Sequence, residues 1–226
     1  MHILVTGASG SGSTTLSAAL AADLSFAHIE ADDFYWLPTD PPYREKRPTR
    51  ERCEQLSARL DGAVNTVMAG SVSGWGDEIE DRFDLIVFLY LKSEIRVARL
   101  GRREVARFGE VDKSFIQWAS QYDNGPLEGR SLAKQKSWLI RRKCPVLKLV
   151  GDLTVVERLV AVKGRLLELS RPLQDIEPLK RLAVHVSVAS QQQAPQIAEM
   201  LQAYLKELSC DPDYQYLPLY WQEPDT

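Results

Sequence analysis

The sequence is poor in cysteine, lacks any long hydrophobic run, and has no excess of positive charge. Its three cysteines, Cys53, Cys144 and Cys210, lie far apart and form no C-x-x-C pair. Neither a disulfide framework nor a zinc site is therefore expected, and a reducing cytoplasmic environment fits best. No apolar run approaches membrane-spanning length, and the chain opens on an expected strand rather than a signal peptide, so we expect no membrane partner.

The charge and size of the chain narrow its class further. The net charge of -3 argues against nucleic acid as the main partner, because a phosphate backbone is bound by a basic surface. With 226 residues, of which 44% are hydrophobic and 26% charged, the chain is long enough to bury one sizeable core. We expect a globular domain with at most one appendage.

Short apolar runs alternate with helical patterns along most of the chain. We expect strands at residues 3–6, 27–30, 66–69, 85–91 and 146–150. We expect helices at residues 14–24, 50–60, 93–108 and 154–169. The first and fourth apolar runs are nearly continuous in Val, Ile, Leu and Phe, which is typical of parallel strands covered on both faces. The alternation predicts a doubly wound α/β sheet whose ligand binds at the carboxyl ends of the strands.

Three segments interrupt this alternation. Residues 37–48 are rich in proline and predict an exposed connection. Residues 101–142 are polar and helix-compatible without a strand pattern, as expected of a mobile lid inserted at the ligand edge. Residues 182–188 alternate like a half-buried strand, and residues 195–208 suit a helix. We therefore predict a core at residues 1–170 and an extension at residues 171–226, packed on the core or on a partner such as a second copy in a homodimer.

A glycine-rich stretch, GASGSGSTT, directly follows the first expected strand. The phosphate-binding loop is written G-x-x-x-x-G-K-[ST]; Gly7, Gly12 and Thr14 match it, but Ser13 occupies the lysine position. Between a strand and a helix such a loop presents several backbone N–H groups to one anion, and glycine permits the sharp turn. We expect a phosphate site made of Gly7, Ser9, Gly10, Ser11, Gly12, Ser13, Thr14 and Thr15.

Asp32 and Asp33 follow the second expected strand and should lie beside the mouth of this loop. A carboxylate there can hold Mg²⁺ or accept a proton from a substrate hydroxyl, and one of the pair can instead cap a short helix. A dinucleotide-binding alternative stays open, because VTGASG resembles the opening of short-chain dehydrogenases and Glu30 or Asp32 has the spacing of a ribose-binding acid. Against it, Thr15 replaces the third glycine and the chain contains no Tyr-x-x-x-Lys.

Four arginines, Arg96, Arg99, Arg103 and Arg107, share one stripe of the helix expected at residues 93–108. Like charges at this spacing repel by a few tenths of a kcal/mol per pair. An anionic ligand such as a triphosphate would remove that conflict. We expect Arg99 and Arg103, at the lid entrance, and Arg130, on the far side of the insertion, to contact the ligand. Arg96 and Arg107 fit a solvated face equally well.

The remaining candidates lie where an acceptor molecule would bind, in the connections after the second and third expected strands. Small residues after the third strand leave room for an acceptor, and Trp75 has a ring that can stack on it. Cationic side chains in residues 37–48 suit an anionic acceptor. These substrate-binding candidates are Tyr35, Arg44, Arg47, Gly70, Ser71 and Trp75. Solvated loop residues, and a tryptophan that plugs the surface, are the alternative interpretations.

The stretches GASGSGSTT, ADDFYW and RLGRR, in this order, resemble the P-loop small-molecule kinases of the adenylate kinase and shikimate kinase type. The resemblance covers about residues 1–170 and is closer still to bacterial adenylate-kinase-related proteins. It implies a three-layer P-loop NTPase fold with a parallel sheet in the order 2-3-1-4-5. It also implies that Thr14 with Asp32 or Asp33 holds Mg²⁺, that Arg99 lies near the base of ATP, and that Arg103 and Arg130 lie near its γ-phosphate.

Ser13 is the departure from this family. Loss of one charge-assisted hydrogen bond costs about 1.5–3 kcal/mol, so we expect nucleotide binding to survive and transfer to depend on a lid arginine. The expected function is an ATP-dependent kinase acting on a small metabolite such as a nucleoside or nucleotide. Asp33 is the leading acceptor base, supported by Arg103 and Arg130. The alternatives are a nucleotide-binding regulatory pseudo-kinase and, more distantly, an NAD(P)-binding dehydrogenase-like protein.

Overall fold

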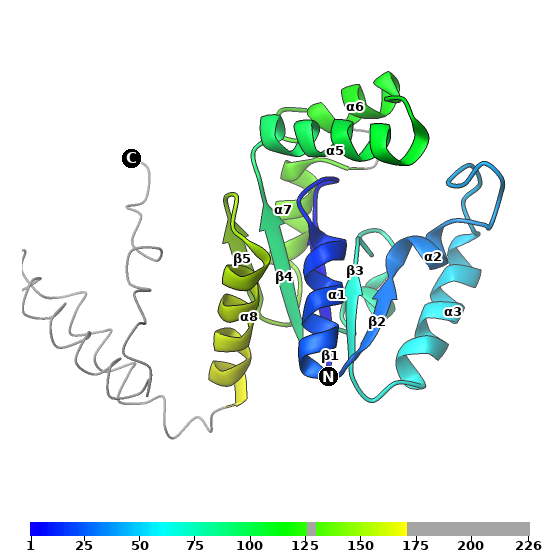
Figure 1. The fold of residues 1–226 in the computed structure, drawn as a ribbon. Helices are drawn as coiled ribbons and strands as arrows, with labels where there is room; N and C mark the ends of the chain where they lie inside the picture. Colours follow the sequence, from blue (N-terminus) through cyan, green and yellow to red (C-terminus); the bar gives the residue numbers. More distant parts are fainter. Residues whose placement is uncertain (126–129, 171–226) are drawn as a thin grey trace, which may run out of the picture. The chain divides into compact units, whose positions relative to one another are not determined.

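The computed structural model describes residues 1–125 and 130–170; the strand and helix expected beyond residue 171 lie outside them. Within the described residues, five parallel strands form one sheet in the order β2-β3-β1-β4-β5 (Figure 1). The strands are β1 (His2–Gly7), β2 (Ala27–Glu30), β3 (Thr66–Ala69), β4 (Leu85–Tyr90) and β5 (Val146–Val150). The P-loop NTPase sheet expected from the sequence is therefore confirmed. Its order differs from the 3-2-1-4-5 order of dinucleotide-binding folds, which argues against the dehydrogenase alternative.

Helices cover both faces of the sheet, because successive residues of a buried strand point to opposite sides. One core cluster joins Ile3 and Val5 to the apolar sides of α1 (Ser13–Leu24) and α8 (Val155–Ser170). The other joins Leu4 and Phe88 to α3 (Thr49–Asp61), the short α4 (Asp77–Glu80) and α7 (Leu132–Ile140). The sheet is thus the middle layer of three, as Figure 1 shows.

The predicted lid is shorter than the insertion that the sequence indicates. Helices α5 (Ser93–Phe108) and α6 (Lys113–Ser120) lie above the carboxyl ends of the strands (Figure 1). Helix α7, within the insertion predicted at residues 101–142, instead packs into the core through Trp138 and Leu139. The sequence did not separate α7 from the polar insertion, because its apolar residues are interrupted by polar residues.

Glu80, the last residue of α4, anchors the loop that follows β3. Its Oε1 accepts hydrogen bonds from the backbone N–H groups of Gly74, Trp75 and Gly76, at 2.7, 3.1 and 3.3 Å. Its Oε2 accepts from the indole of Trp138 and lies 3.0 Å from Nη1 of Arg142. One buried carboxylate therefore joins the loop after β3 to α7 and fixes the acceptor side of the fold.

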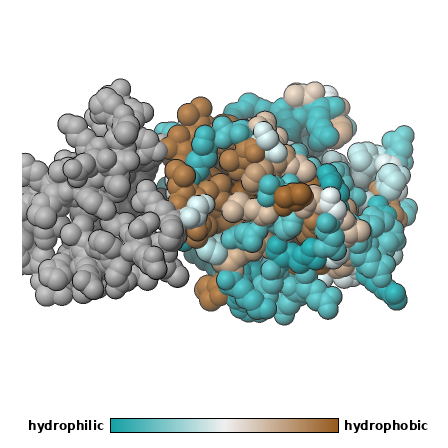
Figure 2. All heavy atoms as spheres, turned by 90° about the horizontal axis from the view of Figure 1, so that it is seen from below, coloured by the Kyte–Doolittle hydropathy of each residue, from teal (hydrophilic) through white to brown (hydrophobic). Residues whose placement is uncertain are grey.

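Several large apolar side chains of β5 and α8 are exposed: Val146, Val150, Val156 and Leu167. Figure 2, which views the molecule from the side of the strand amino ends, shows apolar surface gathered on one side of the described part. No described helix combines the length and the apolar character that crossing a bilayer requires. The homodimer expected from the sequence stays a prediction.

We predict that Glu80→Gln destabilises the protein by about 2–4 kcal/mol, because Arg142 would lose its most buried acidic partner and the loop would lose its charged acceptor. Urea unfolding followed by tryptophan fluorescence measures the change. Glu78→Gln, an exposed residue on the same helix, is the matched control and should leave the midpoint unchanged. Equal midpoints for the two variants would contradict this role for Glu80.

Candidate functional site at the glycine loop

The glycine loop joins β1 to α1 at the carboxyl edge of the sheet. Gly10 has a φ of 83°, and a Cβ there would lie 2.8 Å from the carbonyl oxygen of Arg96, so a larger residue is excluded on both counts. Gly12, with a φ of 91°, caps α1, whose first turn has no side-chain cap. The N–H groups at the start of α1 are therefore available to an anion, and the helix dipole favours negative charge there.

Three arginines of the described chain hold this loop from outside by its carbonyl oxygens. Alternate carbonyls are bound: Gly7 by Nη2 of Arg130 at 2.8 Å, Ser9 by Nη1 of Arg96 at 3.3 Å, and Ser11 by Nη1 of Arg158 at 2.8 Å. They come from separate segments: Arg96 from α5, Arg130 from two residues before α7, and Arg158 from α8. We call Arg96, Arg130 and Arg158 the carbonyl-binding arginines.

Arg96 ties the loop to the lid rather than facing solvent. Its side chain is 1% exposed; Nε donates to the carbonyl of Leu91 at 2.9 Å, and Nη1 donates also to the carbonyl of Ala119. Nη2 lies 3.3 Å from Oδ1 of Asp123. The solvated face considered for Arg96 is therefore wrong, because a guanidinium can bind several carbonyls at once and remain buried.

Arg130 lies at the loop, close to charged and aromatic groups, and its predicted contact with a ligand stays a prediction. Burial lowers the pKa of Arg130, while Tyr122, Asp32 and Tyr35 act in the opposite direction. Its Nε is buried and has no partner among the described residues. Arg130 is thus a desolvated cation with unused donor capacity beside the phosphate loop.

Asp32 and Asp33, on α2 (Ala31–Tyr35), have different surroundings. Asp32 is exposed on one side, but the protein atoms around it raise the pKa of its carboxyl; Arg130 opposes this rise and Asp33 adds to it. Arg103 also attracts Asp32. Asp33 instead acts on His28, whose pKa is lowered by burial and raised by that carboxylate. Of the two acids, Asp32 is therefore the one associated with the cations of the site.

Thr14, the threonine of the loop motif, contacts an acid that sequence reasoning considered only for ribose binding. Its hydroxyl donates to Oε2 of Glu30 at 3.3 Å. Burial raises the pKa of Glu30, and its Oε1 lies 3.4 Å from Nε2 of His28. The position of Glu30 at the end of β2, two residues before Asp32, was the signal that could have identified it.

The two predicted lid arginines have partners outside the loop. Arg99 forms an ion pair with Asp152, in the connection between β5 and α8. Arg103 lies 3.3 Å from Glu104 and 5.9 Å from the ring centroid of Phe115. Both side chains are at least a third exposed. Their roles toward the base and the γ-phosphate of ATP stay predictions.

On the acceptor side, two predicted substrate contacts are occupied by the fold itself. Trp75 is 6% exposed, and the guanidinium carbon of Arg52 lies 4.8 Å from the ring centroids of both Trp75 and Tyr35. Arg47 donates to the carbonyl of Phe34 at 3.2 Å and to Glu51 at 2.6 Å. Trp75 and Arg47 therefore hold α2 and α3 together, and their assignment as substrate contacts stays a prediction.

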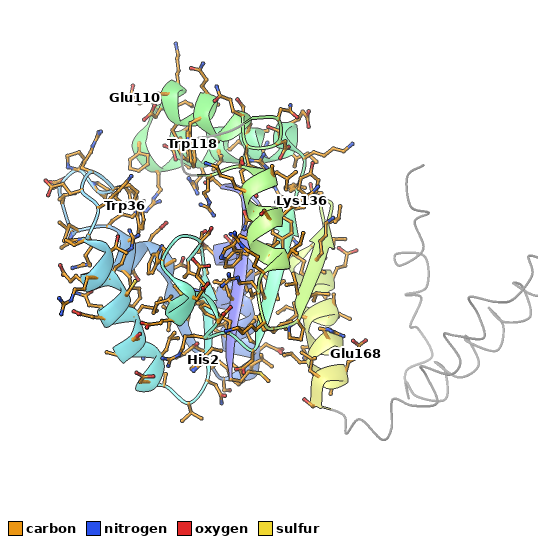
Figure 3. All side chains as sticks on the ribbon, turned by 180° about the vertical axis from the view of Figure 1, so that it is seen from behind. His2, Trp36, Glu110, Trp118, Lys136 and Glu168 are labelled. Carbon is orange, nitrogen blue, oxygen red and sulfur yellow. The ribbon has the colours of Figure 1, made fainter. Side chains whose placement is uncertain are left out.

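The other acceptor-side candidates remain accessible. Arg44 is exposed and attracts Asp112, at the start of α6, across the site. Gly70 lies against the start of α2, since a Cβ on it would be 2.6 Å from Cβ of Ala31, and Ser71 is partly exposed beside it. Figure 3 places Trp36 on the α2 side and Trp118 on the lid side of this edge of the sheet.

The residues at the loop fit a nucleotide triphosphate and its metal ion. The buried side-chain N and O atoms without partners in the described chain are Ser11 Oγ, Glu30 Oε1, Arg52 Nε, Arg130 Nε and Arg158 Nε. All but one belong to the loop or its immediate contacts. Buried polar atoms are nearly always satisfied, so their concentration here indicates a polar ligand. No group of three metal-ligating side chains occurs in the described residues.

Comparison with known proteins yields one clear relative. No protein-family model matches the sequence. The chain is 40% identical over 168 residues to an uncharacterized protein, YqaC, of Bacillus subtilis (strain 168), which covers 70% of this chain and 92% of the relative.

Solved structures resemble the chain more distantly. A shikimate kinase from Bacteroides thetaiotaomicron superposes with a TM-score of 0.45 at 19% identity, covering 74% of this chain and 98% of its own. A gluconokinase from Sinorhizobium meliloti 1021 has a TM-score of 0.45 at 18% identity, with coverage of 75% and 97%. A shikimate kinase from Acinetobacter baumannii, in complex with shikimate, has a TM-score of 0.48 at 15% identity, with coverage of 76% and 94%. Likeness at this level says nothing about activity.

We predict that Asp32→Asn stabilises the fold at neutral pH. A carboxyl whose pKa is raised on folding favours the folded state only when protonated, so this contribution is lost as pH rises through the folded-state pKa. The gain from Asp32→Asn should therefore be present at pH 7 and vanish below about pH 4. Thermal unfolding across this range measures it. Asp40→Asn, at an exposed position in residues 37–48, is the control and should show no such gain; a loss of stability for Asp32→Asn at pH 7 would contradict the prediction.

Proposed function

We propose that this chain, which belongs to the same protein family as Bacillus subtilis YqaC, is an ATP- and Mg²⁺-dependent kinase that phosphorylates a hydroxyl group of a small metabolite. A nucleoside or nucleotide is the acceptor class that we favour. The observation that carries the proposal is the meeting of the glycine loop, Arg130 and Asp32 at one edge of the sheet. An anion-binding helix start, a desolvated cation and a carboxylate are the groups that phosphoryl transfer requires.

Arg130 supports the proposal because it brings positive charge to a loop whose lysine position is Ser13. Its guanidinium is fixed by the carbonyl of Gly7, and its Nε keeps a donor unused by the described residues. Charge placed in advance where it develops during the reaction is the main catalytic device in phosphoryl transfer. We assign Arg130 to the γ-phosphate, with Arg103 as a second cation, while Ser13 offers only a neutral hydroxyl.

Asp32 is the acceptor base that the geometry favours, in place of Asp33. Surrounding protein atoms raise the pKa of its carboxyl, which lies within the field of Arg130, whereas Asp33 is associated with His28. In the proposed step the acceptor oxygen forms a bond to the γ-phosphorus as the bond from that phosphorus to the bridging β–γ oxygen breaks. ADP leaves with the electron pair of the broken bond, and the acceptor proton passes to Asp32.

Thr14 and Glu30 are the residues that we propose for Mg²⁺, with Asp32 close enough to share a water ligand. Their mutual hydrogen bond supports this assignment. Mg²⁺ would neutralise the charge of the β- and γ-phosphates and orient them. Ser9, Gly10 and Thr15 would hold the phosphates through the backbone and α1.

A nucleotide-binding regulatory pseudo-kinase is the second candidate. The observation in its favour is Ser13 itself, because no other residue of the loop motif carries a charge. Such a protein would bind ATP with the same carbonyl-binding arginines but would show no turnover with any acceptor.

We predict that the purified protein releases ADP from Mg·ATP when the correct acceptor is present. Arg130→Met should lower kcat by about 10²–10³-fold, because it removes the cation assigned to the transferring group. Arg141→Met, an exposed arginine at the end of α7, is the matched control and should behave as wild type. The measurement is coupled ADP release over a panel of nucleosides, nucleotides and other hydroxyl compounds.

Two outcomes would overturn the kinase proposal. ATP binding without acceptor-stimulated turnover across the panel would favour the pseudo-kinase. Binding of NAD(P) without binding of ATP would favour the dehydrogenase-like alternative.

A further inference from the structure

Arg158 is a buried arginine at the glycine loop to which the sequence gave no role. It lies in the first turn of α8, and Thr154 and Glu157 fix that turn by reciprocal hydrogen bonds. The backbone N–H of Thr154 donates to Glu157 at 2.6 Å, and the backbone N–H of Glu157 donates to the Thr154 hydroxyl at 3.2 Å. This capping box sets where α8 begins and therefore where Arg158 points.

From that position Arg158 reaches the point where the loop becomes α1. Its Nη1 donates to the Ser11 carbonyl at 2.8 Å, and a Cβ added to Gly12 would lie 2.9 Å from the same nitrogen. Gly12 is therefore required for this approach as well as for its left-handed backbone. The guanidinium lies beside the N-terminal end of α1, next to Ser13, the residue at the lysine position of the motif.

The charge of Arg158 is poorly compensated within the protein. Its residue is 5% exposed, and its Nε is buried without a partner among the described residues. Burial lowers the pKa of Arg158, Arg99 lowers it further, and Asp152 and Glu157 oppose both. Asp152, however, is already paired with Arg99. A buried cation held by a neutral carbonyl costs stability, which indicates that an anion is its functional counterpart.

We propose that Arg158 is a positioning residue for the nucleotide phosphates, and that its charge replaces part of the charge missing at Ser13. By holding the Ser11 carbonyl outward, it turns the N–H groups at the start of α1 toward the bound phosphates. Its guanidinium adds positive charge to the same end of the helix. This inference rests on the proposed nucleotide binding. It adds to that site a residue that is distant from the loop in sequence.

Calorimetric titration of the full-length protein with ATP, ADP and adenosine tests the proposal. Arg158→Met should weaken ATP binding about tenfold or more, the size expected for a charge-assisted contact, and should weaken adenosine binding much less. Adding Ser13→Lys to Arg158→Met should restore most of the ATP affinity. Arg165→Met is the matched control, since Arg165 lies on the same helix but pairs with Glu168, and its affinities should equal those of wild type.

Arg158→Lys keeps the positive charge with fewer hydrogen-bond donors, and it is the test variant to use if Arg158→Met does not fold. It should retain ATP affinity within about threefold even if its thermal midpoint falls, whereas a purely structural role would make the two fall together. Unchanged ATP affinity in Arg158→Met, or an equal loss for ATP and adenosine that Ser13→Lys does not rescue, would overturn the proposal. If wild type itself binds no ATP, the proposed function fails, and this result is distinct from equal binding by wild type and Arg158→Met.

Discussion

Three guanidinium groups bind alternate carbonyls of one loop, and the arrangement of the site follows from those contacts. Arg130, Arg96 and Arg158 hold the carbonyls of Gly7, Ser9 and Ser11. A loop held outward by its carbonyls leaves its N–H groups directed inward, toward the anion-binding end of α1. The three arginines come from different segments, so the loop also sets the spacing between α5, the start of α7 and the start of α8. The glycine loop therefore joins helices that belong to separate layers of the fold.

In the proposed nucleotide site, the same contacts would compensate for Ser13. In the common motif one flexible lysine supplies a mobile charge from within the loop. Here the positive charge is carried by the carbonyl-binding arginines, which are held by backbone carbonyls and largely buried. These guanidinium groups move less than a lysine side chain would, but they already lie at the loop before a ligand binds. Asp32 then lies in a field that Arg130 and Arg103 make positive, although burial still raises the pKa of its carboxyl. A carboxyl with a raised pKa and a cation that is incompletely paired lie together, as is typical of a site arranged for a ligand rather than for stability.

Much of the fold could be predicted from the sequence because its signals are local. Continuous apolar runs identified β1 and β4, and the glycine spacing identified the turn into α1. The site was harder, because its contacts join distant residues. Arg158 lies 147 positions from Ser11, and nothing near it in the sequence indicates a phosphate loop. Burial and long-range contacts were also invisible: Trp75 lies against Arg52, and Arg47 donates to the carbonyl of Phe34 in α2.

Because the positive charge at the loop comes from arginines on other segments, it also links the loop to the predicted lid. A lysine on α1 would act independently of the lid, but Arg96 binds the loop and the carbonyl of Ala119 with the same Nη1, and its Nη2 reaches Asp123. Tyr122, beside these contacts, donates to Gln135, which in turn donates to Thr6 at the end of β1. Burial raises the pKa of Tyr122 to about 12, so this phenol stays a neutral donor. The geometry of the phosphate loop and the position of the lid segment near residue 120 are therefore fixed by shared side chains. Arg96 therefore reaches the loop only while it also holds the carbonyl of Ala119 and Asp123.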